Sequence, residues 1–192
     1  MKKLRGLSLA MSIGALLAST ALAEPPAQRN ELFLGIGDAG LIFMLDDVGT
    51  AVLTLGTVTY GDEVGGFQIV GGYQRWFSSW SSLGVTGSWA GARKTAYFRG
   101  EDVGKVDRRL ITLMIDWRAH WLRRPAWDLY SGVAVGAGEM STDLYSAPDE
   151  DGTYPTFHFI PIGVRGGRDW GIFAETGFGL NGFVKAGVSR RY

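Results

Sequence analysis

Few side chains in this sequence could take part directly in catalysis or metal binding. The chain has two histidines, His120 and His158, and no cysteine, which excludes thiol catalysis and cysteine metal sites. The histidines are expected near opposite strand ends, where they do not converge on one metal ion. His120 is expected to hydrogen-bond to Asp128. The acidic run at 149–151 could bind a divalent cation, but a solvated loop is its simpler interpretation. The sequence therefore predicts no metal or cofactor site.

The strands that would position these residues are clearest in the last hairpin. If residues 180–182 form a three-residue loop with Gly182 in the left-handed conformation, Gly179 faces Phe183 across the hairpin. The last arm then runs ten residues from Phe183 to the aromatic Tyr192. That is the length of a tilted strand that crosses a membrane.

The two arms of this hairpin separate their side chains by polarity. Glu175 and Lys185 fall on one face as diagonal neighbours, and apolar side chains fall on the other. A soluble sandwich could show the same alternation, but the ten-residue length of the last arm favours a strand pair with one face in lipid. The apolar face carries Ile172, Ala174, Thr176, Phe178, Val184, Ala186, Val188 and Tyr192.

The beginning of the chain has a different character. Its first 23 residues place three basic residues before a short apolar run and end in Ala-Leu-Ala. This is typical of a cleaved secretory signal peptide, so we assign residues 1–23 to the signal and 24–192 to a single domain. The apolar run, 7–17, is too short to cross a bilayer as a helix.

The composition of the mature domain excludes further classes. Removing three basic residues from 19 leaves 16 Lys and Arg against 19 Asp and Glu, and this acidic excess argues against nucleic acid as a partner. No mature segment offers ~18 consecutive apolar residues, which excludes a helical membrane protein. Glycine, with 29 of the 192 residues of the whole chain, recurs inside alternating segments, as suits a narrow, curved barrel.

Alternation of apolar and polar side chains predicts six strands before the last hairpin. In the first of them Leu32, Leu34 and Ile36 face outward. In the second and third, Tyr73 faces Val85. The six strands are 31–37, 66–75, 83–97, 109–122, 126–142 and 157–166.

The connections are predicted to alternate in length. Residues 77–80 form a compact turn, whereas the charged segments 99–107 and 143–153 form outer loops. Within the sixth strand, Pro161 lacks a ladder donor and predicts a local bulge. Ile160, Ile162 and Val164 of this strand are expected to face outward and Arg165 inward.

The hairpin of the fourth and fifth strands is expected to turn at 123–125, with Trp121 opposite Trp127 and Ile115 opposite Val133. Its tryptophans lie at strand ends beside a charged turn, where amphipathic rings prefer the membrane interface. Packing in a soluble core is the alternative. Arg123 and Arg124 would lie just outside this interface, in water. The predicted aromatic girdle is Trp117, Trp121, Trp127 and Tyr192.

Residues 38–66 fit two structures. The apolar residues between Leu41 and Val52 follow the three-four spacing of an amphipathic helix, whereas Val52 to Tyr60 is rich in Thr and Val and could be extended. We expect a long first outer loop that carries a short helix. Two extra strands, which would make ten, are the alternative.

These elements predict an all-β fold, an eight-stranded antiparallel transmembrane β-barrel. From residue 29 to 192 the chain resembles the small OmpA/OmpX-type outer-membrane barrels. It is most similar to uncharacterised outer-membrane barrels with a segment like Tyr130-Ser131-Gly132-Val133 and a close like Glu-Thr-Gly-Phe-Gly at 175–179.

This resemblance implies an outer-membrane location, contact with outer-membrane lipid and lipopolysaccharide, and recognition of the C-terminal strand by the barrel-assembly machinery. In that group the last aromatic is usually Phe, so Tyr192 is a mild departure.

An eight-stranded barrel encloses a space about wide enough for its own side chains, which makes a general porin an unsuitable interpretation. The inward charges are of both signs, and we expect them to pair because unpaired charges in a narrow lumen are costly. A proton or ion path is the alternative. Arg191 is also expected to face inward. The predicted lumen polar network is Asp116, Arg118, His120, Asp128, Arg165, Glu175 and Lys185.

Some small outer-membrane barrels modify lipid A, so the resemblance also raises an enzymatic alternative. The lipid A deacylase pattern has a His, a Ser two residues later and a Glu on the next strand. His158 and Glu175 match it, but Ile160 occupies the serine position. We therefore predict no catalytic residue and a non-enzymatic barrel that acts in surface interaction, adhesion or envelope integrity. A lipid A-modifying enzyme is the alternative.

Overall fold

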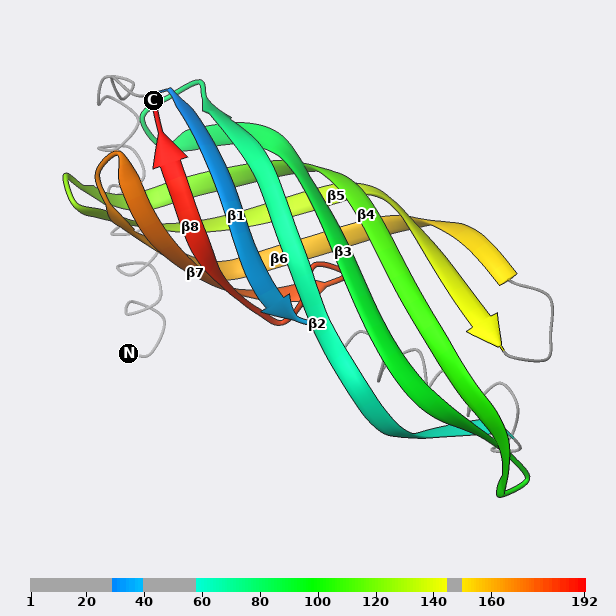
Figure 1. The fold of residues 1–192 in the computed structure, drawn as a ribbon. Helices are drawn as coiled ribbons and strands as arrows, with labels where there is room; N and C mark the ends of the chain where they lie inside the picture. The colour runs from blue at the N-terminus through cyan, green and yellow to red at the C-terminus, as the bar shows by residue number, and fades with distance from the viewer. Residues whose placement is uncertain (1–28, 40–57, 145–149) are drawn as a thin grey trace, which may run out of the picture.

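A computed structural model describes residues 29–39, 58–144 and 150–192, which form one closed antiparallel barrel. Each strand pairs with the next, and β1 pairs with β8 (Figure 1). The predicted all-β, eight-stranded fold is confirmed. The strands are β1 (Asn30–Asp38), β2 (Val58–Trp76), β3 (Ser81–Phe98), β4 (Glu101–Arg124), β5 (Trp127–Leu144), β6 (Glu150–Gly167), β7 (Trp170–Gly179) and β8 (Val184–Arg191).

The pairing of β1 with β2 decides between the eight-stranded and ten-stranded barrels that the sequence allowed. β1 is hydrogen-bonded directly to β2, and the described strands close into a barrel of eight, so the ten-stranded alternative is wrong. The second strand begins at Val58, not Gly66. The predicted helix falls on 40–57 and the predicted signal peptide on 1–23, both outside the described residues. Among the described residues no helix is long and apolar enough to cross a membrane.

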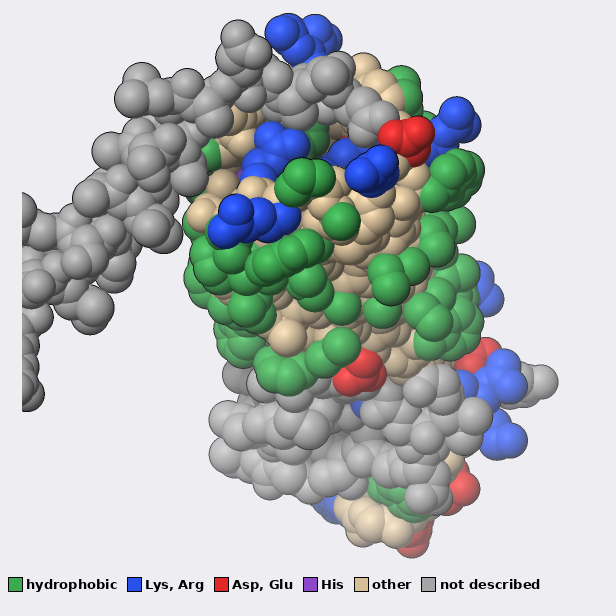
Figure 2. All heavy atoms as spheres, turned by 90° about the vertical axis from the view of Figure 1, so that its left-hand side faces the viewer, with side chains coloured by type: hydrophobic (Ala, Val, Ile, Leu, Met, Phe, Trp, Pro, Cys, Tyr) green, Lys and Arg blue, Asp and Glu red, His purple; other side chains and the backbone are tan. Residues whose placement is uncertain are grey.

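Strict alternation along the strands separates an apolar outside from a polar inside. On β1, Leu32 and Ile36 are exposed while Glu31 and Phe33 are buried, as predicted. Exposed apolar side chains continue around the whole wall and form a band, the apolar belt, which Figure 2 shows on one face. The belt includes Leu32, Leu34, Ile36, Phe67, Ile69, Leu83, Val85, Trp89, Ile111, Leu113, Ile115, Val133, Val135, Phe157, Phe159, Ile162, Val164, Ile172, Phe178, Val184 and Val188.

The strands differ greatly in length. β2 to β6 have 18 to 24 residues, whereas β1, β7 and β8 have 8 to 10. The long strands therefore extend past the last pairs with β1 (Asp38 with Phe67) and β7 (His158 with Gly179). Figure 1 shows this extension, the projecting sheet, at the end opposite the C-terminus.

The projecting sheet replaces loops that the sequence predicted. Residues 99–107 are not a loop, because β3 and β4 pair out to Phe98 and Glu101 around a two-residue turn. Arg99 and Gly100 have φ values of 52° and 84°, as the left-handed residues of a tight hairpin turn require. The charged residues of this segment therefore lie on paired strands and in a tight turn. The predicted loop at 143–153 is likewise shorter, since β5 reaches Leu144 and β6 begins at Glu150.

Two hairpin registers differ from the prediction by two residues, while Tyr73 lies opposite Val85 as expected. In the last hairpin Glu175 pairs directly with Lys185, and Gly179 pairs with His158 of β6 instead of facing Phe183. A shift of two residues keeps every side chain on its face, because the side-chain period of a strand is two. The predicted facing is therefore confirmed although the register is wrong. Gly182 has a φ of 83°, the predicted left-handed conformation.

The β4–β5 hairpin is displaced in the same way. Ile115 lies opposite Val135 rather than Val133, and the turn is at Pro125-Ala126. A register shift between His120 and Leu122 marks a β-bulge at Trp121, so Trp121 does not face Trp127. The bulge places one extra residue on β4, which alternation alone does not reveal.

The bulge predicted at Pro161 is confirmed, because the pairing with β7 shifts between Phe159 and Ile162. The outward facing that was expected for Ile160 is wrong. Ile160 belongs to the residues before the bulge, whose even-numbered side chains point inward, and it is 1% exposed. After the bulge the odd-numbered side chains point inward, and Arg165 is buried as expected.

Candidate functional site

The lumen at the end that carries the short turns contains a continuous row of ion pairs, the basal cluster. Arg165 Nε lies 2.8 Å from Glu31 Oε1, and Arg191 Nε lies 2.9 Å from Glu31 Oε2. Arg191 also reaches Asp128, with Nη2 2.8 Å from Oδ2. His120 Nδ1 lies 2.9 Å from the same Asp128 oxygen. Two carboxylates thus meet two guanidinium groups, and the cluster is balanced in charge when His120 is neutral.

A second balanced group, the central cluster, lies deeper in the barrel. Arg118 bridges the two carboxylates, with Nη2 2.9 Å from Asp116 Oδ2 and Nη1 3.1 Å from Glu175 Oε1. Lys185 Nζ lies 2.8 Å from Glu175 Oε2, and Tyr130 donates a hydrogen bond of 2.7 Å to Glu175 Oε1. All five side chains are nearly or fully buried. Removing water from ions is costly, and here each carboxylate regains at least one cation.

The loop between β7 and β8 closes the lumen from the other side. Asn181 is 1% exposed, and its Oδ1 accepts hydrogen bonds of 3.0 Å from Ser88 Oγ and Thr112 Oγ1. The carbonyl of Leu180 accepts a hydrogen bond from Gln68 Nε2 at 3.1 Å. Beyond it a small apolar cluster fills the space. That cluster contains Ala39, Ala90, Ala92 and Leu110, with Met140 and Leu180 packed against it.

His158 lies inside this filled barrel and not on its lipid-facing side. It is 1% exposed, and Gly177 beside it has room for no side chain, since an added Cβ would lie 2.3 Å from the imidazole Cε1. Ile160 lies inside as well. Neither His158 nor Glu175 therefore presents its side chain on the outer face of the wall.

Comparison with solved structures agrees with this architecture. No protein-family model matches the chain, and no curated protein matches it either. Among solved structures, the N-terminal β-barrel domain of Pseudomonas aeruginosa OprF aligns with a TM-score of 0.52 at 11% identity, covering 86% of this chain and 98% of that domain. The fold is that of a small eight-stranded outer-membrane β-barrel.

Two structures of Ail, the attachment invasion locus protein of Yersinia pestis, align less closely. Both have a TM-score of 0.41 at 15% identity and cover 85% of this chain. They cover 97% and 98% of the Ail chains, and one of them holds the heparin analogue sucrose octasulfate.

In this outer-membrane barrel fold, the aromatic residues expected to form a girdle lie at the short-turn end of the wall. Trp127 and Tyr192 are exposed by 41% and 51%. Trp117 is half-buried and donates a hydrogen bond of 2.8 Å from Nε1 to Ser81. Trp121 donates one of 3.3 Å to Ser131. The structure adds two rings at this level that the sequence reading did not include, Trp80 and Trp170.

The base of the barrel also contains a pair that the sequence reading missed. Trp76 is 2% exposed and its ring centroid lies 3.8 Å from that of His120. Arg123 was expected in water, but the bulge at Trp121 turns it inward, 4.2 Å above the Trp76 ring. If the alternation of the predicted strand 66–75 is continued by one residue, Trp76 is placed inside the barrel. No pattern in the sequence indicates that Asn181 enters the lumen.

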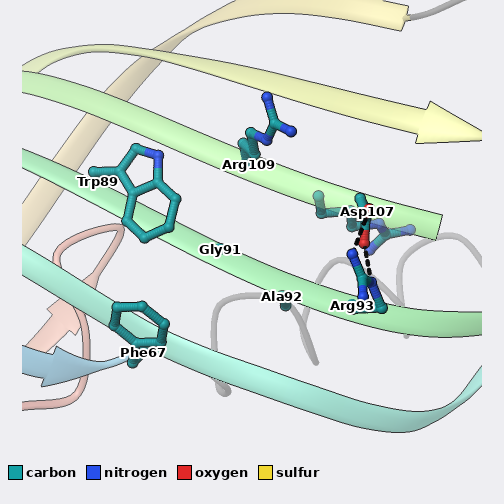
Figure 3. Close-up of a pocket in the computed structure, with 8 residues that line it drawn as sticks. Phe67, Trp89, Gly91, Ala92, Arg93, Asp107 and Arg109 are labelled. Atoms are coloured by element: carbon teal, nitrogen blue, oxygen red, sulfur yellow. Dashed lines mark hydrogen bonds and ion pairs between the residues drawn. The ribbon is translucent and has the colours of Figure 1, made fainter.

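One of the shallow notches on the outer surface has a volume of about 300 Å³ and is drawn in Figure 3. Phe67 and Trp89 form its apolar side, and the missing side chain of Gly91 leaves it open. On its other side, past the apolar belt, Arg93 Nη2 donates a hydrogen bond of 3.0 Å to Asp107. That pairing lowers the pKa of Asp107, so the pair stays ionised at neutral pH. Arg108 and Arg109 also line the notch, and its lining contains no Ser, Thr, Cys or His side chain.

Proposed function

We propose that the chain is a non-enzymatic, integral outer-membrane barrel that acts by surface interaction through its projecting sheet. One contrast carries the proposal: the lumen is filled by balanced charges and the Asn181 loop, whereas β2 to β6 continue well past the closed wall. A filled lumen supports neither transport nor access to a buried histidine. Long paired strands, in contrast, hold side chains rigidly outside the membrane.

The location and the immediate partners belong to the same proposal. Export by a signal at 1–23 would bring the chain to the outer membrane, where the apolar belt contacts lipid and lipopolysaccharide. Recognition of β8 by the barrel-assembly machinery would insert it. With short turns on the periplasmic side, as is usual for such barrels, the projecting sheet faces outward.

The first experiment tests membrane insertion. We expect the protein to fractionate with the outer membrane, and its unheated form to migrate faster than its boiled form in detergent gels. A closed hydrogen-bonded wall resists unfolding, because no backbone edge remains open in the belt. Equal migration together with release by high salt would contradict an integral barrel.

The second experiment tests the role of the projecting sheet. Deleting 94–98 and 101–106 leaves the pair Arg93 and Asp107 next to the Arg99-Gly100 turn. We expect this variant to keep its heat-dependent gel shift but to lose the attachment of expressing cells to glass and polystyrene. Cells lacking the protein are the control. Unchanged attachment with a folded barrel would exclude the projecting sheet as the interacting part.

A further inference from the structure

Exposed arginines surround the barrel at its short-turn end. We call them the arginine rim. Each comes from a different part of the wall: before β1, the end of β2, the end of β4, the β6–β7 turn and the end of β8. Figure 2 shows basic side chains gathered above the band of hydrophobic side chains on the face in view. The rim consists of Arg29, Arg75, Arg124, Arg168 and Arg190.

The rim carries a net positive charge that the local acids do not cancel. Glu31 and Asp128, the nearest carboxylates, are buried and already bound within the basal cluster. Among the described residues, the exposed acidic groups at this end are the Asp169 side chain and the carboxyl group of Tyr192, fewer than the five arginines. No rim arginine forms an ion pair within the described ranges, and Arg190 instead lies over the Trp170 ring at 5.5 Å.

The position of the rim along the strands matches a layer of lipid headgroups. Arg190 is the next outward residue after Val188, and Arg75 is the next after Tyr73. Two residues of a strand span about 6 to 7 Å, so the Arg190 guanidinium lies one step beyond the last belt residue of β8, and Arg75 lies one step beyond the Tyr73 ring on β2. Tryptophans occupy the same level, as they do where a membrane meets water.

The distribution of the rim indicates what it binds. A macromolecular partner would approach one side of the barrel, but these arginines are spread around its circumference. A lipid leaflet surrounds the barrel in the same way. Guanidinium groups bind phosphate oxygens through paired hydrogen bonds, and each basic residue near an anionic surface contributes about 1 kcal/mol.

We propose that the arginine rim binds the phosphate groups of anionic phospholipids in the leaflet at the short-turn end of the barrel. This inference rests on the proposed membrane insertion. It goes beyond that proposal because it assigns a lipid class and a leaflet. The rim then holds the barrel at a defined depth by headgroup contacts that the apolar belt cannot make.

The test measures lipid selectivity of the folded protein. The purified barrel is placed in bilayers of equal parts phosphatidylcholine and phosphatidylglycerol, and the lipids that stay bound are counted by native mass spectrometry. We expect phosphatidylglycerol to be enriched in the unchanged protein. In the double variant Arg75→Gln and Arg124→Gln, the enrichment should fall about fivefold for each arginine removed, which corresponds to about 1 kcal/mol each.

A matched control removes two exposed cations at the other end, in the double variant Arg99→Asn and Lys105→Gln. It should keep the enrichment, and every variant should show the heat-dependent gel shift. Equal loss in both double variants would overturn the inference, because total charge would then explain the selectivity. Inorganic phosphate added to bilayers of phosphatidylcholine alone should not bind in a rim-dependent way; if it does, the rim is a simple anion site.

Two further outcomes decide against the inference. An unchanged protein that folds in phosphatidylcholine but shows no enrichment leaves the proposed membrane insertion intact and removes the lipid assignment. Rim-dependent sedimentation with purified peptidoglycan sacculi, without lipid enrichment, would assign the rim to the cell wall.

Discussion

At the scale of single residues, Glu175 holds the central cluster together. Its two oxygens contact Arg118, Lys185 and the Tyr130 hydroxyl, and the side chain is 2% exposed. A buried ion pair contributes little net stability compared with an apolar pair, but losing one partner leaves an uncompensated buried charge. Arg118 also pairs with Asp116, whereas the described ion pair of Lys185 is with Glu175, so Lys185 depends most on this carboxylate.

Glu175→Ala should lower the free energy of unfolding by about 3 to 5 kcal/mol, because it leaves Lys185 buried without its carboxylate. The measurement is the urea concentration at which the heat-resistant gel form disappears. Glu175→Gln keeps hydrogen bonding and should cost less. The control is Glu139→Gln at an exposed position, and a loss as large as that of Glu175→Ala would contradict the cluster's structural role.

His158 is the residue on which an enzymatic interpretation would depend. It lies inside the barrel with Ile160, and a hydrolytic site would need an attacking group at that position. His158→Ala should therefore leave the acyl-chain pattern of lipid A unchanged. Mass spectra of lipid A from cells with either form, at equal levels of folded barrel, provide the test. A changed acyl pattern in the variant would favour the lipid A-modifying alternative.

At the scale of elements, the bulges decide which side chains enter the lumen. The bulge at Trp121 brings Arg123 over Trp76, and the bulge before Ile162 places Ile160 inside. Each adds a residue to one strand, which reverses the facing of every residue after it. Side-chain facing predicted from alternation is therefore correct within a stretch between two bulges. Beyond a bulge the predicted facing is reversed.

The facing of β5 can be checked at two neighbouring residues. Val133 is 44% exposed in the apolar belt, whereas Ala134 is 3% exposed and faces the lumen. Val133→Arg should impair insertion by roughly 2 to 4 kcal/mol, because it places a charge toward the lipid core. Ala134→Ser should have a much smaller effect. Folded fractions after refolding into lipid vesicles report both, and lipid-side labelling of a cysteine at 134 but not at 133 would show inverted facing.

At the scale of the whole molecule, the closed wall and the filled lumen belong together. An eight-stranded barrel leaves room inside for little more than its own side chains. The basal cluster, the central cluster and the Asn181 loop occupy that room in sequence along the axis. The charges of the basal cluster and of the central cluster are balanced within each cluster, so neither of these two described clusters presents a row of one sign to an ion.

The barrel should therefore give no steady channel conductance. Purified protein inserted into planar bilayers is expected to show no long-lived current steps at neutral pH, since ion pairs close both described layers. Glu175→Ala and Asn181→Ala should be examined beside it as variants that loosen the packing. Stable steps from the unchanged protein would favour the ion-path alternative.

The sequence by itself determined the strand alternation, the eight-stranded class and the identity of most inward charges. Glu175, Lys185 and Arg118 could be placed because a period of two separates faces whatever the exact register. The bulge at Pro161 could be placed because proline lacks a donor. These are local properties of the backbone.

Only the tertiary structure decided which of these residues meet. Glu175 contacts Arg118 from three strands away, and Glu31 contacts Arg165 across the closure of the barrel. The entry of Asn181 into the lumen and the inward turn of Arg123 depend on a hairpin end and a bulge that carry no pattern in the chain. Such contacts exist because closing the wall brings distant strands around one narrow axis, and the energy of burying charge then selects their partners.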